Sequence, residues 1–146
     1  MNIFDINLMK TDVVVDNKDK LFEMMVSDLY QNQIIEEIDG FLKAVITRET
    51  SLSTGVGHGI GIPHGRHSCV KELKAVVYTL SEGVHYDALD GLLVNIIFMV
   101  AIPIEATNEY MKMLGTISKA MHNSDNRSFL LRSNNSEEIL NFLKGI

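Results

Sequence analysis

The segment from Ser53 to Arg66 constrains the fold of this chain more than any other part of it. It consists of S-T-G-V-G-H-G-I-G-I-P-H-G-R and carries five glycines between positions 55 and 65. So many residues without a Cβ atom favour a tight backbone loop. Ile60, Ile62 and Pro63 then indicate a short strand that emerges from the glycine loop.

Two familiar phosphate-binding loops do not fit this spacing. A P-loop requires G-x-x-x-x-G-K followed by Ser or Thr, and the segment contains no lysine. The dinucleotide fingerprint requires G-x-G-x-x-G. Counting from Gly55 places Ile60 at its third glycine, and counting from Gly57 places Ile62 there. The segment is therefore neither of these two motifs.

His64 occupies an unusual position at the end of the glycine segment, between Pro63 and Gly65. Proline fixes its own φ and pushes Ile62 toward extended geometry, while Gly65 leaves space beside the imidazole. A nucleophile that a second protein must reach requires such a setting, and nearby glycine amides can donate to phosphate oxygens. The alternative is that His64 is only a polar turn residue, since most polar residues carry no chemistry.

A metal site is the competing hypothesis for this region. His58, His64, His67 and Cys69 lie close together in the sequence and offer nitrogen and sulfur ligands. Their spacing matches none of the usual zinc patterns, and Cys69 is equally suited to be a small buried hydrophobe. We therefore expect no metal and no organic cofactor.

Helical and strand patterns alternate along the rest of the chain. Asn17 is a plausible cap for a first helix, and a second helix is expected to end near Arg48 and Glu49. This alternation predicts one α/β domain over residues 1–146. The other predicted elements are a short strand at Val13–Val15, core strands at Leu73–Leu80 and Val94–Ile102, a turn at Asp90-Gly91, and helices capped by Thr107 and Ser136.

Charge and apolar content exclude several classes of protein. The formal net charge of -6 disfavours a partner that is a nucleic acid or an anionic membrane. The most apolar run, Val94–Ile104, is too short to cross a bilayer. Met1–Lys10 lacks the pattern of a signal peptide, and Cys69 is the only cysteine, which suits a reducing compartment. We expect a cytoplasmic location without membrane insertion.

The glycine segment up to P-H-G resembles the type-2 enzyme IIA family of the bacterial phosphoenolpyruvate-dependent phosphotransferase system (PTS). This family includes the fructose–mannitol IIA domains and their nitrogen-regulatory relatives. The resemblance continues through E-G-V-H-Y-D-A-L-D-G, V-N-I-I-F-M-V-A-I-P and S-E-E-I-L, with Gly61 at a position where the family usually has alanine. It implies a mixed, mainly parallel sheet of about five strands with helices on both faces, and an acceptor at the edge of this sheet.

The same resemblance implies roles for four residues. His64 is the phosphoryl acceptor, and Arg48 and Thr54 contact phosphate oxygens. Without the resemblance, Arg48 is an exposed charge favourably placed at a helix C-terminus. Tyr110 stands where the family usually carries a second histidine, and it also fits an apolar helix stripe as a core residue. A tyrosine side chain is longer than histidine and does not ionise near neutral pH.

The implied function is that of a phosphocarrier. His64 would take a phosphoryl group from an HPr-type carrier, or from its nitrogen-branch counterpart, and pass it to a IIB domain during sugar uptake of the fructose–mannitol class. One alternative is a nitrogen-type regulatory module whose phosphorylation state controls its binding to regulators or transporters. Another is a degenerate binding domain, because Tyr110 replaces the second histidine. The acidic net charge predicts either basic partners or a docking surface that is locally apolar.

Overall fold

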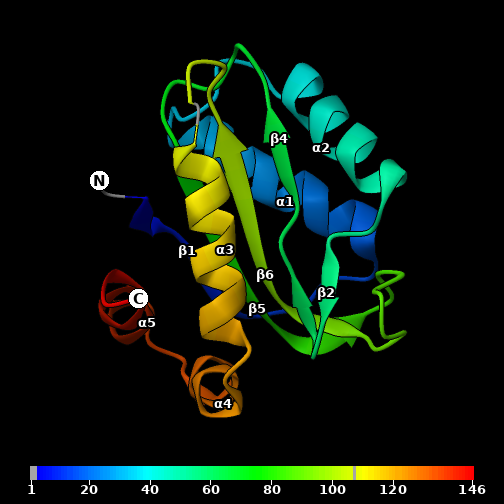
Figure 1. Cartoon of the computed structure of the whole chain (residues 1–146), viewed down its shortest axis with the longest axis vertical. Helices are drawn as coiled ribbons and strands as arrows, with labels where there is room; N and C mark the ends of the chain where they lie inside the picture. The colour runs from blue at the N-terminus through cyan, green and yellow to red at the C-terminus, as the bar shows by residue number, and fades with distance from the viewer. Residues whose placement is uncertain (1–2, 107) are drawn as a thin grey trace.

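A mixed β-sheet with a long central hairpin organises the fold (Figure 1). The structure is a computed structural model that describes residues 3–106 and 108–146. The strand order is β1-β5-β6-β3-β2, and β4 pairs with β6 beyond the end of β3. The six strands are β1 (Phe4–Val13), β2 (Gly55–Gly57), β3 (Ile60–Gly61), β4 (His64–Arg66), β5 (Lys74–Val84) and β6 (Val94–Ile102).

The strand pairings are of both kinds. β1 pairs with β5 in parallel, and β3 and β4 both pair with β6 in parallel. β5 and β6 pair antiparallel, as the predicted turn at Asp90-Gly91 requires, and so do β2 and β3. The predicted α/β class is therefore confirmed, with six strands in place of about five.

Helices cover both faces of the sheet because its central strands are apolar on both sides. Along β6, Ile97, Met99 and Ala101 belong to one core cluster and the residues between them to another, as the two-residue period of a strand dictates. The first cluster lies under α1 (Lys18–Gln31) and α2 (Asp39–Ser51), and the second under α3 (Glu109–Met121), α4 (Ser124–Arg132) and α5 (Ser136–Lys144). No helix in the described part of the chain combines the length and apolarity needed to cross a membrane.

Three of the predicted details need correction or fall outside the structure. The strand expected at Val13–Val15 is wrong, because the first strand is β1 and Val14 is 80% exposed. The register of β1 against β5 shifts twice, so its apolar residues do not alternate cleanly in the sequence. The cap of α5 is Asn135, which accepts from two amides of the first turn, and Ser136 is the first helical residue. Thr107 lies outside the described residues.

The glycine segment folds into a hairpin laid against β6. Its turn residues, His58 and Gly59, have φ values of 57° and 82°, and positive φ at both positions suits a two-residue turn between twisted strands. The carbonyl of Gly59 accepts from the amides of Asn95 and Ile96 on β6. Asp90 accepts from the His58 amide at 2.9 Å. The predicted loop is thus held from both sides before the chain enters β4.

We predict that Gly65→Ala destabilises the fold by about 1–3 kcal/mol. A Cβ atom at this position would lie 2.9 Å from Val45 Cγ2 and 3.2 Å from the Val45 amide nitrogen, so α2 would have to move away from β4. The measurement is chemical denaturation.

Gly115→Ala is the matched control for this substitution. A Cβ atom at Gly115 meets nothing within 4 Å, and removing a glycine from the interior of α3 stabilises it by about 0.5–1 kcal/mol. Equal effects of the two substitutions would contradict the close packing of α2 on β4.

Candidate functional site

His64 begins β4, the strand in which the glycine segment ends. Among the described strands, β4 pairs with β6 alone, so His64 lies at an edge of the sheet, as expected. Alternate residues of a strand point to opposite faces. Gly65 therefore faces α2, while His64 and Arg66 share the opposite face, where both line one hollow.

A backbone carbonyl determines which nitrogen of His64 carries the proton. Nδ1 lies 3.0 Å from the carbonyl oxygen of Ile62. A carbonyl only accepts hydrogen bonds, so Nδ1 must be the donor. In the neutral ring, Nε2 then has a free lone pair, which makes it the ring nitrogen that is able to act as a nucleophile.

The surroundings of His64 keep its ring neutral. Burial lowers the pKa of His64 below its ordinary value of 6.5, because a charged imidazolium loses hydration there. The Ile62 hydrogen bond opposes this shift, the positive charge of Arg48 reinforces it, and the charge of Glu49 opposes it. The net lowering leaves the lone pair available at neutral pH.

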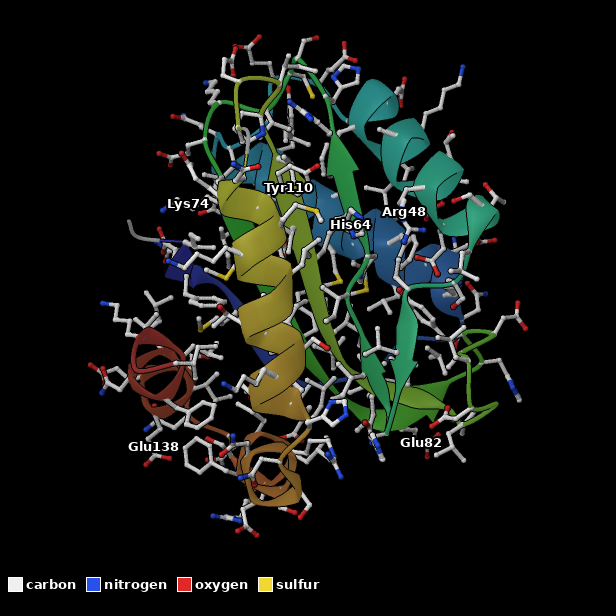
Figure 2. All side chains as sticks on the ribbon, viewed as in Figure 1. Arg48, His64, Lys74, Glu82, Tyr110 and Glu138 are labelled. Carbon is white, nitrogen blue, oxygen red and sulfur yellow. The ribbon has the colours of Figure 1, made fainter. Side chains whose placement is uncertain are left out.

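The hollow beside His64 has a volume of about 490 Å³ and lies between α2 and α3. Figure 2 shows Arg48, His64 and Tyr110 around this part of the molecule, on α2, β4 and α3 respectively. No carboxylate occurs among the described residues that line it, and its two charged groups are both guanidinium groups. The lining residues are Ala44, Arg48, His64, Gly65, Arg66, Ile102, Tyr110, Met111 and Leu114.

Arg48 and Tyr110 are both brought to His64, each in a defined setting. Arg48 lies in the last turn of α2 and donates from Nη1 to the Leu52 carbonyl at 2.7 Å. Tyr110 is half-buried and packs against the core under α3 to α5 while it lines the hollow. The sequence left open whether Tyr110 is a core residue or a site residue. In the structure its ring both contacts the core and forms part of the wall of the hollow.

Thr54 lies next to the site, but its donors are directed inward. The residue is buried, its amide donates to Glu49 Oε2 at 2.8 Å, and its hydroxyl donates to Glu49 Oε1 at 2.5 Å. A phosphate contact from Thr54 would require these bonds to be exchanged. In this geometry Thr54 anchors the glycine loop, and its contact with phosphate stays a prediction.

Glu49 is the functional residue that sequence reasoning missed. Its carboxylate is buried and also pairs with Lys18 Nζ at 3.0 Å. Lys18 in turn donates to the carbonyl of Tyr86 at 2.9 Å, and the Tyr86 hydroxyl lies 2.8 Å from the hydroxyl of Thr54. The buried face of α2 carries a residue at every fourth position, namely Phe41, Val45 and Glu49. This spacing is the sequence signal that could have indicated the burial of Glu49.

A continuous series of hydrogen bonds joins this carboxylate to the ring of His64. Glu49 holds the amide of Thr54, the carbonyl of Thr54 accepts from the amide of Ile62 at 3.0 Å, and the carbonyl of Ile62 accepts from His64 Nδ1. Burial of Tyr86 and its contact with Glu49 raise the pKa of the Tyr86 phenol far above its ordinary value. Tyr86 is therefore a neutral partner of the network.

Comparison with known proteins identifies the family. The sequence model described as "Phosphoenolpyruvate-dependent sugar phosphotransferase system, EIIA 2" matches residues 2–146. The chain belongs to this family. A fructose-specific EIIA component from Haloferax volcanii is 28% identical over 109 residues, which are 75% of this chain and 71% of that protein. Against the longer fructose-specific EIIABC component of Bacillus subtilis, the matched region spans only 21% of that protein.

Solved structures agree with this assignment. The nitrogen regulatory protein IIA-Ntr from Neisseria meningitidis is 30% identical, with a TM-score of 0.91 over 97% of both chains. The complex of enzyme IIAMTL and phosphorylated enzyme IIBMTL from Escherichia coli contains a chain with a TM-score of 0.83 and 17% identity, covering 98% of this chain and 99% of that one. The second likeness supports the fold of this IIA chain.

The described residues of the metal hypothesis do not gather into one candidate metal site. The ring of His58 lies 5.9 Å from the ring of His122, whereas His67 Nδ1 accepts from the Cys69 amide. Cys69 is buried, as expected for a small hydrophobe. The described residues contain no group of three or more His, Cys, Asp or Glu side chains that could hold a metal ion.

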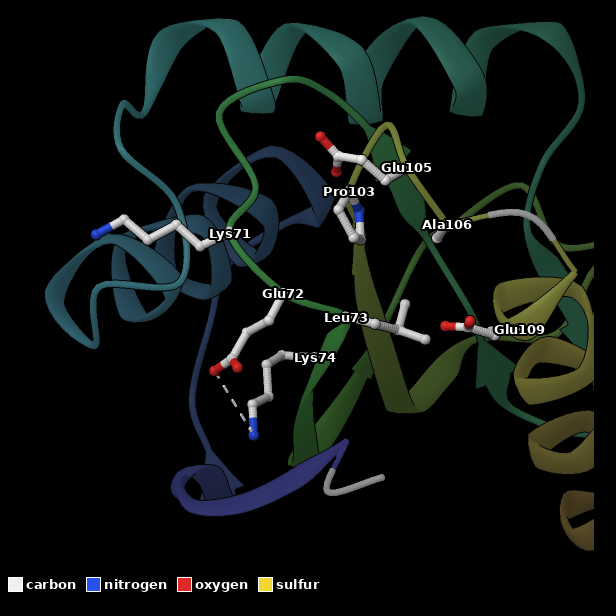
Figure 3. A pocket seen from close by; sticks show the side chains of 8 residues that line it. All are labelled: Lys71, Glu72, Leu73, Lys74, Pro103, Glu105, Ala106 and Glu109. Carbon is white, nitrogen blue, oxygen red and sulfur yellow. Dashed lines mark ion pairs between the residues drawn. The ribbon is translucent and has the colours of Figure 1, made fainter.

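A separate hollow of about 420 Å³ lies where β5 begins and β6 ends (Figure 3). It contains none of the predicted site residues, and it mixes charges of both signs, including the Lys74–Glu72 pair at 3.9 Å. The hollow at His64 is therefore the candidate site of this IIA chain. The separate hollow is lined by Lys71, Glu72, Leu73, Lys74, Pro103, Glu105, Ala106 and Glu109.

We predict that Glu49→Ala lowers the free energy of unfolding by about 3 kcal/mol, because Lys18 and the Thr54 amide lose a buried partner. Denaturant unfolding measures this change. Glu23→Ala breaks the exposed Lys20–Glu23 pair and should cost about 0.5 kcal/mol or less. A cost for Glu49→Ala as small as that of this control would show that the network does not hold the loop.

Proposed function

We propose that this chain is a cytoplasmic phosphocarrier that accepts a phosphoryl group on Nε2 of His64. The donor would be an HPr-type carrier and the receiver a IIB domain of a sugar PTS. The single observation that carries this proposal is the hydrogen bond from His64 Nδ1 to the Ile62 carbonyl, since it assigns the lone pair of the neutral ring to Nε2. Family membership supplies the class of reaction.

The proposed step needs no proton transfer. The Nε2 lone pair attacks phosphorus in line, the bond from phosphorus to the donor's imidazole nitrogen breaks, and its electron pair stays on that nitrogen. The proton on His64 Nδ1 remains in its bond to Ile62. Such a transfer depends mostly on positioning and on stabilisation of charge.

Arg48 is suited to stabilise that charge. It lines the same hollow as His64, and its planar guanidinium has five N–H donors, of which those on Nη1 are engaged with Leu52 and Ser51. Guanidinium groups bind phosphate oxygens through charge-assisted hydrogen bonds. We therefore assign Arg48 to the phosphoryl oxygens.

The surface around His64 is suited to protein partners. A further hollow, of about 400 Å³, adjoins the His64 hollow and shares Arg48 and His64 with it. Its rim presents large apolar side chains that are between 42% and 65% exposed. Such an exposed apolar patch is typical of interaction sites. Of the two expectations for docking, this patch supports the locally apolar surface. The rim residues are Leu52, Val56, Leu89 and Met111.

A regulatory role is the second candidate function. It is favoured by the likeness to the nitrogen regulatory protein IIA-Ntr of Neisseria meningitidis, at 30% identity over 97% of the chain. In that case the same phosphoryl group on His64 would add negative charge beside the apolar rim and change the affinity for a regulator or transporter. Loss of the phosphoryl group to a cognate IIB domain distinguishes sugar transport from regulation.

We predict that incubation with phosphoenolpyruvate, Enzyme I and an HPr-type carrier adds one acid-labile phosphoryl group to the wild-type chain. Intact-mass measurement should show no addition to His64→Ala, because the nucleophile is missing. His58→Ala and His67→Ala are matched controls close to His64 in the sequence and should be modified like wild type. An unmodified wild-type chain with several donors would contradict the proposal and favour a degenerate binding domain.

We also predict the direction of the pH dependence. Because the pKa of His64 is lowered from 6.5, the ring is neutral at pH values above this lowered pKa. Phosphoryl acceptance should therefore fall only as the pH drops below it. Histidine NMR titration gives the midpoint. Arg48→Ala should raise this midpoint, since its positive charge opposes protonation. A midpoint above 6.5 in wild type would contradict the described environment.

A further inference from the structure

A second guanidinium belongs to the His64 hollow and has no role in the proposed function so far. Arg66 follows His64 by two residues on β4, so the strand period places both side chains on one face. Both line the hollow together with Arg48 and Tyr110. β4 thus presents a nucleophile and a cation side by side.

The guanidinium of Arg66 is held in place from two directions. Nη2 donates to the carbonyl of Ile104 at 2.5 Å and to the carbonyl of Ala106 at 2.9 Å. The guanidinium carbon also lies 5.7 Å from the centre of the Tyr110 ring, within the range of a cation–π interaction. Little side-chain entropy remains to be lost when such a group binds a ligand.

The fixed guanidinium keeps donors available. Within the described part of the chain, the hydrogen bonds of Arg66 use Nη2 alone. A guanidinium has further N–H groups on Nη1 and Nε. The hollow supplies no carboxylate from described residues to occupy them, so an anion beside His64 is the natural acceptor.

We propose that Arg66 is a second phosphoryl-binding residue of this site and that Tyr110 positions it. The inference rests on the proposed acceptance of a phosphoryl group at His64. It also gives Tyr110 a definite role, because its ring holds a permanent cation on the wall of the hollow. Arg48 and Arg66, from α2 and β4, then neutralise the phosphoryl group together.

The test uses phosphoramidate as a small phosphoryl donor, so that no carrier protein has to dock. Ammonia leaves as the phosphorus–nitrogen bond of this reagent breaks and the bond to His64 Nε2 forms. The full chain is compared with Arg66→Gln, Arg66→Lys and Tyr110→Leu. Intact mass gives the rate of modification, and ³¹P NMR gives the pH midpoint at which the bound phosphoryl group loses its last proton.

Arg66→Gln should slow modification about tenfold or more and raise the ³¹P midpoint, because a nearby cation favours the dianion. Arg66→Lys keeps the charge, so it should keep the midpoint near that of wild type. Tyr110→Leu should shift the midpoint in the direction of Arg66→Gln, since the guanidinium is retained but less firmly held.

Arg132→Gln is the matched control, because the Arg132 guanidinium also lies over an aromatic ring, 5.6 Å from Phe129, outside the hollow. It removes the same charge and should behave like wild type. If wild type is modified and Arg66→Gln has the same rate and the same midpoint, the role of Arg66 is overturned while acceptance at His64 stands. Failure of wild type to be modified by phosphoramidate and by protein donors would overturn both.

Discussion

The site depends on the hydrogen bonds and the ion pair of the buried Glu49 carboxylate. A buried charge is costly unless it is paired and hydrogen-bonded, and Glu49 meets this requirement with Lys18 of α1, Thr54 of the glycine segment and Tyr86 of the loop after β5. One carboxylate thus ties together segments that are far apart in the sequence. Through Thr54 and the backbone of Ile62, the same bonds reach the ring of His64.

This arrangement gives an acidic chain a local surface that suits an anion. The formal net charge is -6, yet the described lining of the His64 hollow contains two arginines and no carboxylate. Glu49, the acid next to Arg48 in the sequence, is turned into the interior and neutralised there by Lys18. The surface beside His64 therefore combines guanidinium groups with exposed apolar side chains such as Leu52 and Met111, which suits the docking of another protein over a phosphoryl group.

Sequence reasoning predicted the parts of the fold that have strong local signals. Unbroken apolar runs indicated β5 and β6, and Asp90-Gly91 indicated the turn between them. The glycine, proline and histidine pattern singled out His64, and the family resemblance implied its position at an edge of the sheet. β1 was missed because bulges interrupt its alternation. Such irregularities depend on the partner strand, and the sequence of β1 alone does not contain them.

The side-chain partners within the site were less predictable for a related reason. Whether Thr54 faces phosphate or Glu49 depends on a helix, a loop and a lysine that meet only in three dimensions. In the sequence Arg66 resembles an ordinary surface charge, and only the fold places it on the same face as His64 and brings Tyr110 of α3 beside it. Residue types and spacing single out His64 as the candidate nucleophile, whereas its electrostatic surroundings come from tertiary contacts.

The most direct test of the proposed site is a measurement of the tautomer of His64 in the unphosphorylated protein. Long-range ¹H–¹⁵N correlation spectra at a pH above the lowered pKa distinguish a protonated from an unprotonated ring nitrogen. We predict that Nδ1 carries the proton, that Nε2 is bare, and that the ³¹P label appears on Nε2 after transfer. A ring protonated on Nε2, or a phosphoryl group on Nδ1, would contradict the claim that the Ile62 carbonyl selects the nucleophile.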